Sequence, residues 1–239
     1  SASLHAADHN ARMDAIRAVA NDCSSSQVLL ERLGESLADP HGSVRECAAL
    51  ILGERAASDP SLLASLTQLV DCVEGDGGRF RLRQRLGALH ALGRAGLVGG
   101  IAEPFLNDPR AACVRSLTDD SSDVRFQAVA ALRRLGVPGD AVDAVRELMG
   151  DQDAEVSALS AELLADVADK VSISQMIQLR GRLRGRARGQ VTIALGRLMA
   201  QSGNVGQEMS GDLPGLVADL GKLARRVPEG LGAIEALGQ

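Results

Sequence analysis

Short apolar motifs with the spacing of helices return along the chain at similar intervals. "GALHALGR" at 87–94 returns as "GAIEALGQ" at 232–239, and variants of this motif lie between them. Periods of roughly 30 to 47 residues indicate stacked helical hairpins. The pattern therefore predicts an all-α protein, a right-handed α-α superhelix (α-solenoid) of about six hairpins. The last leucines of the motifs, which we call marker leucines, lie 31 to 42 residues apart, at Leu52, Leu92, Leu132, Leu164, Leu195 and Leu237.

An acidic turn precedes three of these motifs. Asp39, Asp119 and Asp151 each lie five residues before a valine, and that valine lies eight residues before the marker leucine. A turn rich in Asp and Ser, followed by apolar residues at helical spacing, indicates the start of a helix. We expect the acid to cap the free amides there and to suit the positive end of the helix dipole. Each repeat is thus predicted to be a helix A, a tight turn and a helix B.

The motifs divide the chain into a leading helix, at about 8–21, and six helical pairs within one domain, 1–239. Proline lies at or near several of the predicted boundaries, and Pro104 and Pro109 are expected to kink or split the first helix of the third pair. The pairs are placed at about 27–57, 61–95, 101–136, 140–168, 172–201 and 212–239.

The repeats resemble the HEAT-like repeat family, and more narrowly the short repeats of phycobilin lyases and many bacterial proteins. The resemblance covers nearly the whole chain, and in that family the turn acid and the following arginine link neighbouring repeats. It implies a structural role for Arg85 and Arg188, which occupy the arginine position of the second and fifth repeats. The fold hosts many functions, so the resemblance implies architecture more than activity. The matching turn residues are Asp39, Val44, Arg45, Asp119, Val124, Arg125, Asp151 and Val156.

The second and fifth repeats replace the acidic turn with alternating arginines in the same register. "RFRLRQR" occupies 79–85 and "RLRGRAR" occupies 182–188. Equivalent positions of a solenoid lie along one edge, so we expect both segments on a common edge, roughly 30 Å apart. Cations beside free amides at a helix start favour an anion, although solvated charges or weak internal ion pairs are the simpler alternative. The candidate binding residues are Arg79, Arg81, Arg83, Arg180, Arg182, Arg184 and Arg186.

Composition narrows the class of protein. Hydrophobic residues make up 45% of the 239 residues, yet the chain has no Trp or Tyr and only three Phe. No apolar run reaches the roughly 18 residues of a membrane span, and the N-terminal residues lack the apolar region of a secretory signal. The four cysteines, at 23, 47, 72 and 113, form no CxxC motif and suit a reduced, cytoplasmic protein. Arginine far outnumbers lysine, which points to a GC-rich bacterial genome.

Candidate catalytic or metal-binding residues are few. His5 and His9 lie one helical turn apart beside Asp8, but a further ligand is missing, so we expect no metal site. His90 belongs to an apolar motif and is interpreted as a half-buried core residue. Cys47 and Cys113 are interpreted as structural thiols, because nothing in the sequence activates them. Since nucleotide and nucleophile motifs are also absent from the sequence, we expect no enzyme activity and no cofactor.

These observations favour a non-catalytic scaffold or adaptor that binds a partner protein, an acidic one if the arginines take part. Nucleic acid or another phosphate ligand is the alternative, although the chain carries a net charge of −5 and lacks Trp and Tyr for stacking on bases. A phycobilin lyase-like subunit is the second alternative, by family likeness alone. The sequence stops inside a helix B motif, at "IEALGQ". We therefore expect either more chain beyond it or an end covered by a partner or a second copy.

Overall fold

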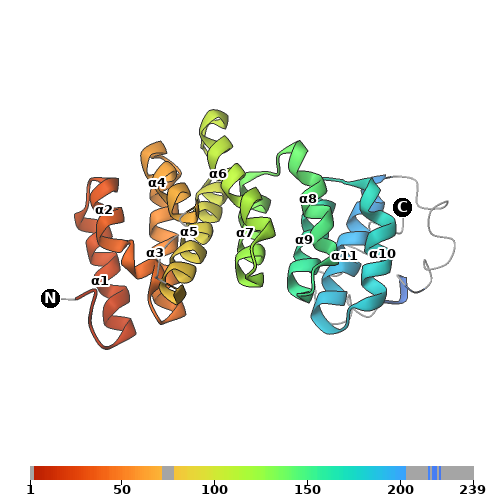
Figure 1. Ribbon diagram of the computed structural model, residues 1–239, viewed down its shortest axis with the longest axis horizontal. Helices are drawn as coiled ribbons and strands as arrows, with labels where there is room; N and C mark the ends of the chain where they lie inside the picture. The colour runs from red at the N-terminus through yellow and green to blue at the C-terminus, as the bar shows by residue number, and fades with distance from the viewer. Residues whose placement is uncertain (1–2, 72–77, 203–214, 216, 220, 222–239) are drawn as a thin grey trace. The chain divides into compact units, whose positions relative to one another are not determined.

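The computed structural model (Figure 1) describes residues 3–71, 78–202, 215, 217–219 and 221. Every regular element in this part of the chain is a helix, and the helices form two compact units, Ser1–Pro138 and Gly139–Gln239. Consecutive helices pair as hairpins, so the predicted all-α solenoid class is confirmed. The extent of a single domain over 1–239 stays a prediction. None of the helices described is both long and apolar enough to cross a membrane.

The first unit stacks a leading helix and three hairpins. Helices α3, α5 and α7 pack side by side in one layer, while α4 packs against α2 and α6 in the other (Figure 1). The leading helix α1 packs against α2 and α3. The elements of this unit are α1 (His9–Asp22), α2 (Ser26–Leu33), the 3₁₀ helix η1 (Glu35–Ala38), α3 (Gly42–Ala56), α4 (Pro60–Asp71), α5 (Gly78–Val98), α6 (Glu103–Arg115), η2 (Ser116–Thr118) and α7 (Ser122–Leu135).

The core of the first unit lies between these layers. The marker leucines Leu52, Leu92 and Leu132 are all 0% exposed, and the turn valines Val44 and Val124 are buried beside them. Each set comes from equivalent positions of successive repeats, so one apolar stripe per helix B forms a continuous core. Burying a leucine side chain contributes about 1.5–3 kcal/mol, which makes these positions the main source of cohesion between repeats.

Small residues let the helices of the α3–α5–α7 layer approach closely. A Cβ atom added to Gly53 of α3 would lie 2.4 Å from the carbonyl oxygen of Ala91 in α5. At the equivalent Gly93 of α5, the added Cβ would lie 3.3 Å from the Cα of Ala131 in α7. The glycine after the marker leucine is therefore a contact position between neighbouring helices.

Helix α5 is one turn longer at its start than its neighbours. α3 begins at Gly42 and α7 at Ser122, each ten residues before its marker leucine, whereas α5 begins at Gly78, fourteen residues before Leu92. The additional four residues include Arg79 and Arg81. The second repeat has thus replaced an acidic turn with helix, and its alternating arginines lie on that helix.

The second unit contains two described hairpins. α9 packs against α8 and α11, and α11 packs against α10. The marker leucines Leu164 and Leu195 are 1% and 0% exposed. Apart from 215, 217–219 and 221, the expected pair at 212–239 lies outside the described residues, as does Leu237. The elements are η3 (Gly139–Ala141), α8 (Val142–Glu147), η4 (Leu148–Gly150), α9 (Ala154–Asp166), η5 (Lys170–Ser172), α10 (Ile173–Arg182) and α11 (Gly185–Ser202).

The two prolines of α6 do not split that helix. It runs without a break from Glu103 to Arg115, with Pro104 in its first turn and Pro109 inside it. A proline in the first turn costs no intrahelical hydrogen bond, because the amides there have no partner within the helix. The expected split of the first helix of the third pair is therefore wrong, while the expected kink stays a prediction.

Candidate functional site

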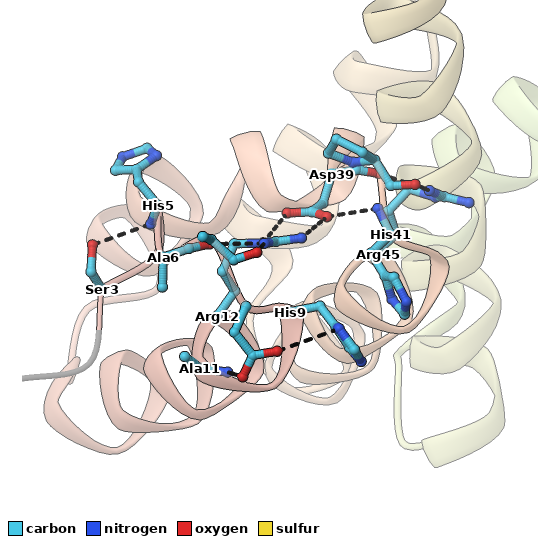
Figure 2. A network of polar contacts seen from close by, with 12 residues as sticks. Ser3, His5, Ala6, His9, Ala11, Arg12, Asp39, His41 and Arg45 are labelled. Carbon is cyan, nitrogen blue, oxygen red and sulfur yellow. Dashed lines mark hydrogen bonds and ion pairs between the residues drawn. The ribbon is translucent and has the colours of Figure 1, made fainter.

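Two turn aspartates of the first unit each bind an arginine of an earlier helix, and Figure 2 shows the contact of Asp39 with Arg12. The Asp39 carboxylate accepts hydrogen bonds from Nε and Nη2 of Arg12 on α1, at 2.8 and 2.9 Å. The Asp119 carboxylate accepts one from Nη2 of Arg85 on α5, at 2.7 Å. We call each of these pairs a rung. All four side chains are at most 17% exposed, so the rungs are more shielded than ordinary surface ion pairs.

The same aspartates shape their own turns. Asp39 Oδ1 accepts the backbone N–H of His41 at 2.8 Å, and Asp119 Oδ1 accepts that of Ser121 at 2.9 Å. His41 and Ser121 are the N-cap residues of α3 and α7, so each acid lies two residues before the N-cap and does not cap the helix. The expected capping role is therefore wrong at these two turns. Asp153 is the residue that caps α9, accepting two first-turn amides at 2.8 and 3.3 Å.

The rung at Asp39 also sets the ionisation of this carboxyl. Burial alone would raise the pKa of Asp39. The hydrogen bonds from the Arg12 guanidinium and from the His41 backbone outweigh burial and hold the pKa below its ordinary value. Arg45 completes this turn, since its Nη1 donates to the carbonyl oxygens of Asp39 and Pro40 at 2.7 and 3.0 Å. Figure 2 shows this network joining α1 to the start of α3.

The arginines of the second repeat lie on the first two turns of α5. Arg79 and Arg81 are exposed and Arg83 is half-buried. None of the three forms an ion pair with an acidic side chain within the described part of the chain. We call these three residues the first arginine surface. Arg85, one turn further on, belongs to the rung with Asp119, as a structural role requires.

The arginines of the fifth repeat divide between the interior and the surface. Arg180 is 2% exposed, and its Nη2 donates to the Asp219 carboxylate at 3.0 Å. Arg188 donates to the same carboxylate at 2.7 Å. Because Arg180 is buried against Asp219, we do not include it among the residues offered to a ligand. Asp219 lies 39 residues further along the chain, so the sequence pattern held no signal for this pair.

Arg182, Arg184 and Arg186 are exposed and form the second arginine surface. They lie at the end of α10, in the turn, and at the start of α11. Arg184 donates to the carbonyl oxygens of Gly181 and Leu183, which leaves its charge without an acidic partner among the residues described. The first arginine surface belongs to one unit and the second to the other, and their common edge stays a prediction.

Many arginines elsewhere in the described residues pair with acids and these six do not, although the exposed Arg32 and Arg134 also form no ion pair there. Within the described residues the two arginine surfaces form no ion pair, so the alternative that they neutralise internal acids finds no support there. By contrast, the arginines that pair with carboxylates include Arg12, Arg17, Arg85, Arg94, Arg110, Arg115, Arg146, Arg180, Arg188 and Arg197.

The other candidate groups are in structural settings. The ring of His9 stacks on that of His41 with centroids 3.9 Å apart, and His9 Nδ1 lies 3.6 Å from the Asp8 carboxylate (Figure 2). The described residues hold no group of three or more His, Cys, Asp or Glu able to bind a metal ion. Burial raises the pKa of the Cys113 thiol to about 12, and burial also raises that of Cys47, so neither thiol is activated.

Sequence reasoning missed a groove across three helices of the first unit. It has a volume of about 340 Å³ and crosses α3, α5 and α7. We call it the B-helix groove. The signal was present in the repeat frame, because two of the lining residues, Glu46 and Phe126, each lie six residues before a marker leucine. Its lining includes the side chains of Arg45, Glu46, His90, Asp123, Phe126 and Gln127.

No family model matches the chain, and no curated protein matches it in sequence. Among solved structures it is similar to an engineered protein, at 18% identity and a TM-score of 0.47 over 84% of this chain and 94% of the other. A designed armadillo repeat protein, solved with the peptide (KR)4, has 16% identity and a TM-score of 0.47 over 82% and 96%. The Escherichia coli protein YibA has 15% identity and a TM-score of 0.45 over 99% and 90%.

Proposed function

We propose that this chain is a non-catalytic scaffold of HEAT-like repeats that binds an acidic partner protein through its two arginine surfaces. The observation that carries the proposal is the contrast in pairing. The rung arginines, such as Arg12 and Arg85, are held by carboxylates of the chain, whereas the six surface arginines present charges without an ion pair in the described structure. Those charges are therefore available to carboxylates of a partner.

The position of these arginines is costly for the fold. The first turn of a helix carries positive partial charge, and a cation there costs roughly 0.3–1 kcal/mol. Arg79 and Arg81 lie in the first turn of α5, and Arg186 lies in the first turn of α11. A bound carboxylate would offset this repulsion, because it meets both the guanidinium group and the free amides of the turn.

The expected affinity follows from the number of contacts. An exposed ion pair contributes about 0.2–1 kcal/mol, so a single contact is too weak to hold a partner. Three contacts on one surface give about 0.6–3 kcal/mol, which corresponds to roughly 3- to 150-fold in affinity. Binding should weaken as salt rises, because exposed charges are screened over about 10 Å at 0.1 M ionic strength.

The test is binding of a fluorescent peptide of eight glutamates to the full chain, measured by anisotropy at 50 and 200 mM salt. We expect Arg79→Glu with Arg81→Glu to weaken binding about 5- to 30-fold. Arg182→Glu with Arg184→Glu should do the same for the second surface. The control is Arg17→Glu with Arg134→Glu, which makes the same change in net charge at exposed residues outside both surfaces.

Equal loss in the control would show that only net charge matters and would refute the assignment of these surfaces. Failure of wild-type protein to bind the peptide at low salt would also refute it. A random duplex DNA is measured in parallel. If DNA binds more tightly than the peptide and loses affinity in the same variants, the surfaces bind phosphate and the scaffold proposal is replaced by a nucleic-acid one.

A further inference from the structure

The B-helix groove is built from equivalent positions of three successive repeats. Glu46 of α3, Leu86 of α5 and Phe126 of α7 each lie six residues before the marker leucine of their own helix. Asp123 of α7 and His90 of α5 also line the groove. A volume of about 340 Å³ is at the lower end of the range for ligand sites and accommodates a side chain rather than a large ligand.

The two carboxylates of the groove differ from the acids of this unit that pair with arginine. Asp39, Glu54, Asp71, Glu103 and Asp119 each pair with an arginine. Glu46 and Asp123 form no ion pair or side-chain hydrogen bond within the described part of the chain, and both are exposed. They therefore offer two free acceptors on opposite helices, α3 and α7, of the same groove.

The remaining lining suits a cation more than an anion. Phe126 is half-buried and gives the groove an aromatic wall, and aromatic rings attract ammonium and guanidinium groups. Gln127 adds a neutral hydrogen-bonding group. Arg45 is the cation of the lining. Its Nη1 donates hydrogen bonds to the backbone carbonyl oxygens of Asp39 and Pro40 in its own turn.

His90 is held neutral in this setting. Burial lowers its pKa, and the positive charges of Arg134 on α7 and Arg94 on α5 lower it further, against an opposing effect of Glu46 on α3. At neutral pH the imidazole thus adds no positive charge to the groove. It can accept a hydrogen bond through one ring nitrogen and donate through the other.

We propose that the B-helix groove binds an arginine or lysine side chain of a partner protein, between the carboxylates of Glu46 and Asp123 and against the ring of Phe126. This site is separate from the arginine surfaces and takes ligands of the opposite charge. It goes beyond the proposed function, because it adds a second, specific anchor to the scaffold. A partner that uses both would carry an acidic stretch and a basic residue.

The test uses three labelled octapeptides in which glycine alternates with arginine, with citrulline or with glutamate. Citrulline has the shape of arginine without its charge. We expect the arginine peptide to bind the full chain at least fivefold more tightly than the citrulline peptide, and to shift backbone amide resonances of α3, α5 and α7 in NMR spectra. Glu46→Gln with Asp123→Asn should lower its affinity about fivefold, towards that of the citrulline peptide.

A matched control separates the groove from diffuse attraction to an acidic chain. Glu31→Gln with Asp108→Asn removes the same charge from exposed residues outside the groove and should leave affinity unchanged. Phe126→Leu should weaken the arginine peptide two- to fivefold, through loss of the cation–π contact. Equal loss in the control and the groove variant overturns the proposal, and so does tighter binding of the glutamate peptide at the groove resonances.

Protonation of His90 supplies an independent readout. A pH titration that runs below the lowered pKa of His90 should add a positive charge to the groove and weaken binding of the arginine peptide, whose own charge does not change. His90→Gln should reduce that pH dependence while the protein stays folded. A pH dependence of undiminished size in His90→Gln contradicts the proposed position of the ligand. The arginine surfaces tested with the glutamate peptide contain none of the groove residues, so each proposal can fail alone.

Discussion

Replacing Gly53 by alanine should destabilise the first unit, whereas the same replacement at Gly42 of the same helix should not. A Cβ at position 53 would lie 2.4 Å from the carbonyl oxygen of Ala91 and 2.7 Å from the Cβ of Arg94, both fixed atoms of α5. At position 42 the nearest heavy atom would be the mobile end of the Arg45 side chain, at 3.6 Å. The two substitutions therefore share their chemistry and differ in the space available.

The magnitude follows from two opposing effects. Alanine is favoured over glycine inside a helix by up to about 1 kcal/mol, which stabilises both variants. Overpacking a contact between two backbones costs about 1–3 kcal/mol, and it applies at position 53 alone. We expect Gly53→Ala to lower the free energy of unfolding by about 1–2 kcal/mol. Gly42→Ala should raise it by less than about 1 kcal/mol.

The assay combines thermal unfolding with hydrogen exchange. In a chain of this size, 1–2 kcal/mol corresponds to roughly 2–8 °C in the melting temperature. Because two units can unfold separately, exchange of the α3 and α5 amides should report the loss in the first unit, and α9 amides should not change. Gly93→Ala should change stability by an amount between those of the other two variants, because its added Cβ would lie 3.3 Å from the Cα of Ala131. Gly53→Ala melting at or above the wild-type temperature would refute close approach of α3 and α5 as the reason for this glycine.

Two further predictions concern acids of the first unit. Asp59 accepts hydrogen bonds from Ser26, Ser61 and the first-turn amides of α4, and these bonds lower the pKa of its carboxyl to about 2. The ionised Asp59 should therefore stabilise the fold above about pH 4, and that contribution should be lost as the pH falls towards 2. Acid titration of Asp59→Asn should show a flatter loss of stability in this window, and an unchanged slope would contradict the assignment. A double-mutant cycle on Arg12 and Asp39 should give a coupling free energy of about 1.5–3 kcal/mol. The exposed pair Arg17 and Asp14 should give less than about 0.5 kcal/mol. Equal coupling energies would refute the importance of burial for the Arg12–Asp39 pair.

The architecture was accessible to sequence analysis because it depends on local periodicity. A marker leucine recurs at every repeat and its helix B starts ten residues earlier in four of the five described repeats, at α3, α7, α9 and α11. The exception, α5, starts one turn earlier at Gly78. That extension could not be predicted from the repeat pattern, since arginine is compatible with both a helix and a turn.

The site was less accessible because it depends on distances between residues far apart in the chain. The alternating arginines looked alike in sequence, yet Arg180 is buried by Asp219 while Arg182 is exposed. The turn acids were expected to cap helices. They instead accept arginines 27 and 34 residues earlier in the chain, as in the Arg12–Asp39 and Arg85–Asp119 rungs. Only the packing of one repeat on the next brings these groups within hydrogen-bond distance.

The rungs also bear on why the arginine surfaces exist. Thirteen residues before the marker leucine, the first and third repeats carry the rung acids Asp39 and Asp119, while the second and fifth carry Arg79 and Arg182. Each replacement removes an acid that could tie two repeats together and adds a cation that the scaffold leaves exposed. For stability alone the acid is the better residue at all four positions, since half-buried charged hydrogen bonds contribute about 1.5–3 kcal/mol. Under the proposed function, these positions exchange stability for charge offered to a partner, which is the pattern expected of a binding surface.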